Sequence, residues 1–225
     1  MTTTQQTKRD LPAARLDATD PRHLFGRAVA VATATIAAVE PDQLDLPTPC
    51  AELDVTALLG HLVGVLNRAA AMGRGEDAMA VPETIDGADV VWDEVWADAA
   101  TAAEEAWRDD AALARTVVLP WATLPAGAAL LGYLNEVVVH TWDLARATGQ
   151  HPSWDDDVVA AAFAAISAVL PADGRSELFE RMMAAVDTSE VPDGFAIAPF
   201  AEAVAVGPYA TPIDRLVAYN GREPS

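Results

Sequence analysis

The sequence has few of the residues that would bind it to nucleic acid or to a membrane surface. It contains 14 Lys and Arg residues against 34 Asp and Glu residues, which gives a formal net charge of -20. Contacts with phosphate backbones or anionic lipid need clustered Lys and Arg. We therefore expect neither nucleic acid nor a membrane as a partner.

Cysteine and long apolar runs are also scarce. The single cysteine, Cys50, cannot form an internal disulfide, and no charged-then-apolar leader precedes it, so a cytoplasmic location is expected. The longest charge-free apolar stretches, Ala28–Val39 and Val158–Leu170, fall short of the roughly 20 residues that a membrane-spanning helix requires. Cys50 itself fits a small buried residue or a thiol whose partner the sequence does not identify.

What the chain does contain favours an all-α fold. Apolar residues make up 52% of the sequence, Ala and Val dominate them, and Asn-Gly hairpin turns are absent. The polar, aperiodic residues 1–19 are expected to form a tail, residues 20–150 a four-helix bundle, and residues 151–225 a C-terminal helical extension packed on the bundle.

Capping residues and apolar periodicity place the bundle helices. Asp20 followed by Pro21 is typical of a helix start, and Asp54 is expected to cap the second helix. The four predicted helices begin near Pro21, Asp54, Asp89 and Pro125. In the same order, they end near Val39, Gly73, Trp107 and Thr148. The apolar, proline-broken segment Arg115–Leu124 suggests a long crossover rather than a tight turn. Further helices are expected at 155–170, 177–186 and 212–219.

The fourth predicted helix carries ionisable groups although it should be buried on most sides. At about 100° per residue, Tyr133, Glu136, His140 and Asp143 fall on one strip. A buried carboxylate costs several kcal/mol unless it is paired or bound to a metal, so Glu136 needs a partner. The Glu-x3-His spacing puts Glu136 and His140 on one helical face, close enough to converge on one cation.

His61 is the third candidate ligand, because it lies on the inward stripe of the second helix between Leu58 and Val65. Gly60 and Gly64 each cost about 1 kcal/mol relative to Ala in a helix, and close approach of another helix would compensate that cost. Such an approach would bring His61 toward the fourth helix.

Two histidines and one carboxylate leave coordination positions open, as in a catalytic metal site. Zinc is the first choice, and the same donors suit Fe(II), Ni or Mn. Asp143 and Tyr133 are candidates to orient a histidine N–H or a bound water. The same spacing is also typical of a surface ion pair or of a satisfied core pair, and an inward histidine usually has a backbone or carboxylate partner.

Three stretches resemble the DinB-like superfamily of metalloenzymes, within it the mycothiol-dependent maleylpyruvate isomerase-like branch of actinobacterial type. They are TPCAELDVTALLGHLVG (Thr48–Gly64), LNEVVVHTWDLARATGQ (Leu134–Gln150) and TPIDRLVAYNGREP (Thr211–Pro224). The resemblance implies a four-helix bundle with a C-terminal addition and implies that His61, Glu136 and His140 are metal ligands. It further implies chemistry on a low-molecular-weight thiol such as mycothiol, used as cosubstrate with an electrophilic substrate.

The leading hypothesis is thus a divalent-metal-dependent S-transferase or isomerase, in which the cation lowers the pKa of a thiol. One alternative is a non-catalytic protein that binds a metal or a hydrophobic ligand. Another is a hydrolase that uses metal hydroxide, and a further one is a helical domain with a buried ion pair and no metal. The chain is expected to be a monomer or a homodimer.

Overall fold

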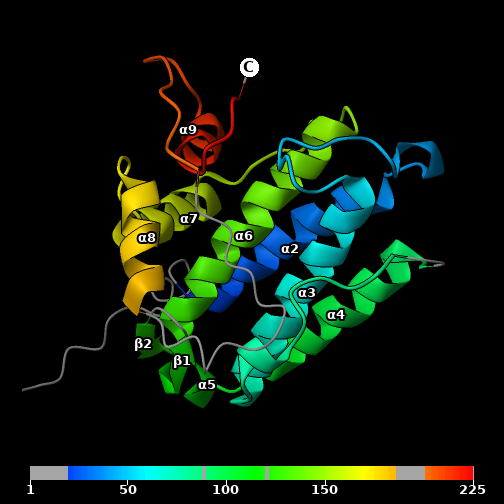
Figure 1. Cartoon of the computed structure of the whole chain (residues 1–225). Coiled ribbons are helices and arrows are strands. Elements are labelled where there is room, and N and C mark those ends of the chain that lie inside the picture. The colour runs from blue at the N-terminus through cyan, green and yellow to red at the C-terminus, as the bar shows by residue number, and fades with distance from the viewer. Residues whose placement is uncertain (1–19, 88–89, 120–121, 186–200, 225) are drawn as a thin grey trace, which may run out of the picture.

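The fold is a helical bundle with a small two-stranded sheet. The computed structural model describes residues 20–87, 90–119, 122–185 and 201–224 (Figure 1). The tail expected at 1–19 lies outside the described residues. The four helices of the bundle are α2 (Pro21–Ala37), α3 (Val55–Arg74), α4 (Trp92–Ala106) and α6 (Ala126–Ala147). The predicted all-α bundle is confirmed.

Local capping explains where these helices begin and end. The Asp20 carboxylate accepts a hydrogen bond from the backbone N–H of Arg22, and the Asp54 carboxylate accepts one from that of Ala57. Both caps satisfy backbone donors that the first helical turn leaves unpaired. Gly75 ends α3 with a φ of 80°, a left-handed conformation that glycine adopts without steric cost.

Helix α6 forms the centre of the bundle, since it packs against both α2 and α3, while α4 packs against α3 and α2. Leucines from α3 and α6 fill the space between these helices, and they are fully buried: Leu58, Leu62, Leu66, Leu130, Leu134 and Leu144. Helix α3 is long and apolar enough to cross a membrane by length and composition alone, but 78% of its apolar window is buried inside the fold. It is a core helix of the bundle, like α6.

The long crossing connection of the bundle joins α3 to α4. A Cβ on Gly87 would meet Thr56 and Trp92, where both helices begin, and a Cβ on Gly73 would meet Ala106, where α4 ends. The two helices therefore run parallel, and the connection, which includes the short helix η2 (Ala78–Ala80), returns along α3. This location corrects the expectation that the crossover lies at Arg115–Leu124.

The same return explains two glycines of α3. A Cβ on Gly60 would collide with the carbonyl oxygen of Ile85, and one on Gly64 with that of Glu83. The prediction that another helix approaches these glycines is therefore wrong: the backbone of the connection does so. Ile85 also donates its backbone N–H to the carbonyl of Gly60 over 3.3 Å.

A pair of antiparallel strands stands where the crossover was predicted. After the short helix α5 (Ala111–Ala114), strand β1 (Thr116–Leu119) pairs with β2 (Ala122–Pro125), with Leu119 opposite Ala122. Val117 and Leu119 are buried while Thr116 and Val118 are exposed, the alternation expected of a strand that covers a core on one face. A strand of four residues is too short for this alternation to be recognised in a sequence segment that is mostly apolar.

Within the described residues, three helices follow the bundle: α7 (Asp156–Val169), α8 (Arg175–Ala185) and α9 (Pro212–Tyr219). Helix α7 packs on α6, α2 and α9, and α9 also reaches α6. Figure 1 shows α9 at the top of the molecule, above α7, so the end of the described chain lies against α7 and α6.

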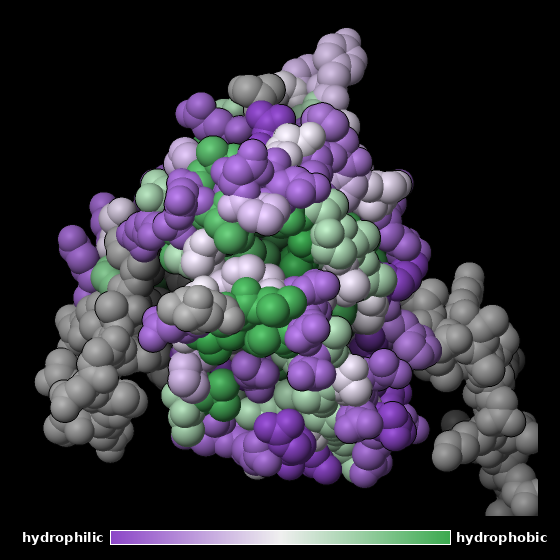
Figure 2. Space-filling model, turned by 90° about the vertical axis from the view of Figure 1, so that its right-hand side faces the viewer, coloured by the Kyte–Doolittle hydropathy of each residue, from purple (hydrophilic) through white to green (hydrophobic). Residues whose placement is uncertain are grey.

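The molecular surface is largely hydrophilic, as the net charge requires. On the face that Figure 2 shows, apolar residues gather in the middle and hydrophilic residues surround them. Exposed large apolar side chains of the described residues include Val91, Val118, Val169 and Tyr209.

Candidate metal centre

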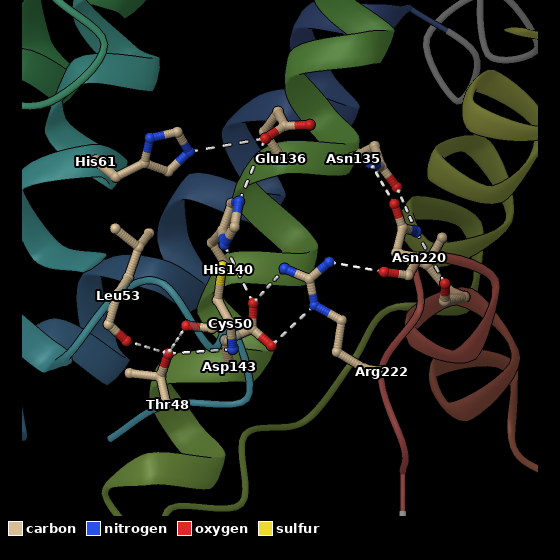
Figure 3. A network of polar contacts seen from close by, with 11 residues as sticks. Thr48, Cys50, Leu53, His61, Asn135, Glu136, His140, Asp143, Asn220 and Arg222 are labelled. Carbon is tan, nitrogen blue, oxygen red and sulfur yellow. Dashed lines mark hydrogen bonds and ion pairs between the residues drawn. The ribbon is translucent and has the colours of Figure 1, made fainter. Parts of the chain in front are cut away.

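The structure brings His61, Glu136 and His140 together between α3 and α6. The Nε2 atom of His61 lies 3.8 Å from Oε2 of Glu136, and Nε2 of His140 lies 3.3 Å from the same oxygen. The two imidazole rings meet edge to face, with their centroids 4.6 Å apart. One donor atom of each side chain lies within 4.8 Å of the other two. Figure 3 shows His61 projecting from α3 toward the two residues of α6.

The centre is closed on the histidine side and open at the carboxylate. The side chains of His61 and His140 are 11% and 10% exposed, whereas that of Glu136 is 37% exposed. The imidazoles are thus packed within the bundle, and solvent reaches the cluster at Glu136.

Electrostatics bind the cluster together without a cation. Burial alone would raise the pKa of Glu136, but the neighbouring imidazoles of His140 and His61 outweigh burial and hold this pKa well below its usual range. Burial alone would lower the pKa of His140, but Asp143 and Glu136 outweigh burial and raise this pKa to about 9. In the metal-free protein His140 is therefore protonated at neutral pH.

His61 is the member of the cluster whose hydrogen bonding is incomplete. Its Nε2 atom is buried and has no hydrogen-bond partner among the described residues. A separation of 3.8 Å from Glu136 is too long for a hydrogen bond. Buried polar atoms are normally satisfied, so an imidazole nitrogen left bare and directed at a carboxylate and a second imidazole needs an explanation. These donors fit a divalent cation, which histidine and carboxylate ligands bind in proteins.

Asp143 holds the far side of His140. Its Oδ2 atom lies 3.1 Å from Nδ1 of His140, and its side chain is fully buried. A carboxylate that accepts the Nδ1 hydrogen leaves Nε2 directed at Glu136, which is how buried carboxylates orient metal-ligating histidines. The contact places Asp143 where the predicted orienting role requires it, and that role stays a prediction.

Arg222 is the functional candidate that the sequence prediction missed. Its Nε donates to Oδ1 of Asp143 over 3.2 Å, and its Nη2 donates to Oδ2 over 2.8 Å. The side chains of Asp143 and Arg222 are 0% and 16% exposed. Burial alone would raise the pKa of Asp143, but hydrogen bonds from His140 and Arg222 lower it. The only signal in the sequence was the third family-like stretch, which contains Arg222.

Cys50 lies near His140 and Asp143. Its sulfur is within 4.8 Å of donor atoms of His140 and Asp143, and burial raises the pKa of its thiol. Arg222 already pairs with both carboxylate oxygens of Asp143, so a cation there would face a guanidinium. Cys50 is half-buried rather than fully buried, and its backbone N–H donates to Thr48 Oγ1 over 3.1 Å.

Tyr133 lies on α6 one turn before Glu136. Burial raises the pKa of its phenol to about 12, so the hydroxyl remains protonated at neutral pH. Within the described residues this hydroxyl makes no hydrogen bond, and the polar contacts of the two histidines are with Glu136 and Asp143. Its predicted role in orienting a ligand therefore remains a prediction.

The fold is a helical bundle of the DinB-like kind, with a His/Glu/His cluster between two of its helices. Residues 25–145, more than half of the chain, match the family model of the mycothiol maleylpyruvate isomerase N-terminal domain. The chain belongs to this family, as the resemblance predicted.

The chain is also similar to individual proteins. Two uncharacterized proteins from two strains of Mycobacterium tuberculosis are 31% identical to it over 152 residues, which cover 67% of this chain and 80% of each relative. Crystal structures of the mycothiol-dependent maleylpyruvate isomerase and of a mutant of it superpose with TM-scores of 0.51, at 15% and 14% identity. Each alignment covers 69% of this chain and 70% of the other. At this identity the likeness shows the fold.

Proposed function

We propose that this protein is a divalent-metal-dependent enzyme that acts with a low-molecular-weight thiol of the mycothiol type, as an S-transferase or isomerase. His61, Glu136 and His140 would hold the metal. The observation that carries the proposal is the unpartnered, buried Nε2 of His61, which faces Glu136 and His140. Membership in the maleylpyruvate isomerase N-terminal domain family supports the thiol part.

The residues of such a site would have different roles. When bound, a divalent cation supplies Lewis acidity that lowers the pKa of a thiol coordinated to it. His140 is held by Asp143 with Nε2 toward the centre. Glu136 lies where solvent reaches the cluster, so cosubstrate and electrophile would enter beside it. Three protein donors leave coordination positions open, which distinguishes this set from a closed structural site.

Tyr133 is the neighbouring group suited to contact a substrate. Its phenol stays neutral at physiological pH because burial raises its pKa to about 12. A neutral hydroxyl donates a hydrogen bond to a carbonyl or carboxylate oxygen without competing for the cation. We place Tyr133 as a donor to the electrophilic substrate in this proposal.

Metal content is tested first, by elemental analysis of purified wild type beside His61→Ala and Glu136→Gln. The matched controls are His151→Ala and Glu52→Gln, which replace exposed residues of the same types. We expect about one divalent metal per chain in wild type and both controls, and little in the two centre variants. Equal metal content in all five proteins would contradict the proposed ligands.

Thiol dependence is tested next with the metal-loaded protein. Consumption of an electrophile, such as an activated aryl halide or an epoxide, is followed with and without mycothiol. The proposal predicts turnover that requires the thiol and is lost in Glu136→Gln but kept in Glu52→Gln. Thiol-independent hydrolysis would instead identify a hydrolase. Bound metal without turnover of any electrophile would favour a binding protein.

A further inference from the structure

A buried chain of hydrogen bonds links the C-terminal segment 211–224 to the metal centre. Arg222 donates two parallel hydrogen bonds to the two carboxylate oxygens of Asp143, and one of these oxygens lies 3.1 Å from Nδ1 of His140. Figure 3 shows the guanidinium and the imidazole on either side of the Asp143 carboxylate. A two-bond pair fixes the plane of a carboxylate as well as its position.

The segment that carries Arg222 is itself anchored to α6 and α7. The amides of Asn135 and Asn220 donate to each other over 3.1 Å in both directions. The Tyr219 hydroxyl donates to the carbonyl of Leu170 over 2.5 Å, and Arg222 Nη1 donates to the carbonyl of Asn220 over 2.7 Å. Asn135 directly precedes Glu136, so the segment contacts α6 beside two of the candidate ligands.

We propose that Arg222 is a positioning residue for the metal centre. By holding Asp143, Arg222 fixes the orientation of the His140 ring. The C-terminal segment thus supports a ligand set whose members all come from the N-terminal domain. This inference rests on the proposed metal binding and goes beyond the family domain, which matches only residues 25–145. It assigns to the segment a role in metal affinity.

The physical reason lies in the burial of Asp143. The carboxylate is fully buried and would be poorly compensated without its guanidinium partner, because His140 reaches only one of its oxygens. A carboxylate released from Arg222 can rotate or move, and the imidazole bonded to it moves too. Loss of such outer partners typically weakens metal binding by about 10- to 100-fold.

The test measures zinc affinity by competition with a chromophoric chelator, using full-length protein. Arg222→Gln should weaken binding by about 10- to 100-fold. Arg222→Lys should lie between it and wild type, since an ammonium cannot hold both carboxylate oxygens in one plane. The control is Arg215→Gln on helix α9 of the same C-terminal segment, whose guanidinium donates, among the described residues, only to the carbonyls of Ala210 and Pro208. It should bind zinc within about twofold of wild type.

A double-mutant cycle shows whether Arg222 acts through Asp143. If it does, the pair Arg222→Gln and Asp143→Asn together bind zinc no more weakly than Asp143→Asn alone, within about twofold. Full additivity of the two losses, or wild-type affinity in Arg222→Gln, would overturn the inference. Thermal unfolding of the metal-free variants checks folding, and Arg222→Lys decides the matter if Arg222→Gln does not fold.

The outcomes separate this inference from the proposed function. Zinc binding without thiol-dependent turnover would remove the enzyme proposal and leave the role of Arg222 standing. Wild-type zinc affinity in the Arg222 variants of an active enzyme would remove only the role of Arg222. Absence of zinc binding by wild type would overturn both.

Discussion

The Nε2 atom of His61 lies 3.8 Å from Oε2 of Glu136 and is buried without a hydrogen-bond partner among the described residues. The two residues come from different helices and are separated by most of the bundle sequence. A metal-free protein gains little from this arrangement, because a buried polar atom without a partner is costly. A bound cation would remove that cost.

His61→Leu should therefore separate stability from metal binding. It removes an unsatisfied buried nitrogen and keeps a similar side-chain volume, so the unfolding free energy of the metal-free protein should change by no more than about 1 kcal/mol. Zinc binding should be lost. Denaturant unfolding and chelator competition on the same samples measure the two effects. A large loss of metal-free stability would show that His61 has a structural partner.

The metal-free protein should lose stability as the pH rises through the range of His140. The folded state raises the pKa of His140 from 6.5 to about 9, because Asp143 and Glu136 outweigh burial. Folding therefore favours the protonated ring. This stabilisation is complete below pH 6.5 and disappears between pH 6.5 and about 9. Denaturant unfolding across this range should show the decline in wild type, and His140→Gln should lack it.

Gly64→Ala should be destabilising although alanine is the better helix former. A Cβ at this position would collide with the backbone of Glu83 in the α3–α4 connection, and overpacking of this kind costs about 1 to 3 kcal/mol. Gly26→Ala is the matched control, because a Cβ there meets no described atom within 4 Å. That variant should gain about 0.5 to 1 kcal/mol. Equal effects in thermal unfolding would contradict the close contact.

Asn220→Ala should weaken the docking of the C-terminal segment. It leaves the amide of Asn135, which is 2% exposed, without its reciprocal partner. An unsatisfied buried amide costs about 1 to 3 kcal/mol. Hydrogen exchange should show faster exchange of backbone amides in residues 212–219. Unchanged exchange in that helix would show that other contacts hold it.

Much of the fold was predictable because its signals are local. Asp20 and Asp54 act within one helical turn, so capping chemistry located the starts of α2 and α3. The juxtaposition of Glu136 and His140 follows from helical periodicity. His61 could be added because it lies among apolar residues of a core helix. That these three bind a metal is still a prediction.

The remaining features depend on contacts between distant segments. Gly60 and Gly64 indicated close packing. Because a helix and a loop that approach this closely both require a glycine, the sequence did not show which of the two it would be. The strand pair after α5 is too short for its period to be seen. Arg222 follows Asp143 by 79 residues, and no local pattern pairs a guanidinium with a carboxylate over that distance.

Anomalous diffraction from crystals of the zinc-loaded protein tests the central claim most directly. We expect one anomalous peak at the zinc absorption edge between α3 and α6, with His61 Nε2, His140 Nε2 and a Glu136 oxygen at about 2.0 to 2.2 Å from it. Absence of a peak at this position, or a peak bounded by Cys50 and Asp143 instead, would contradict the account.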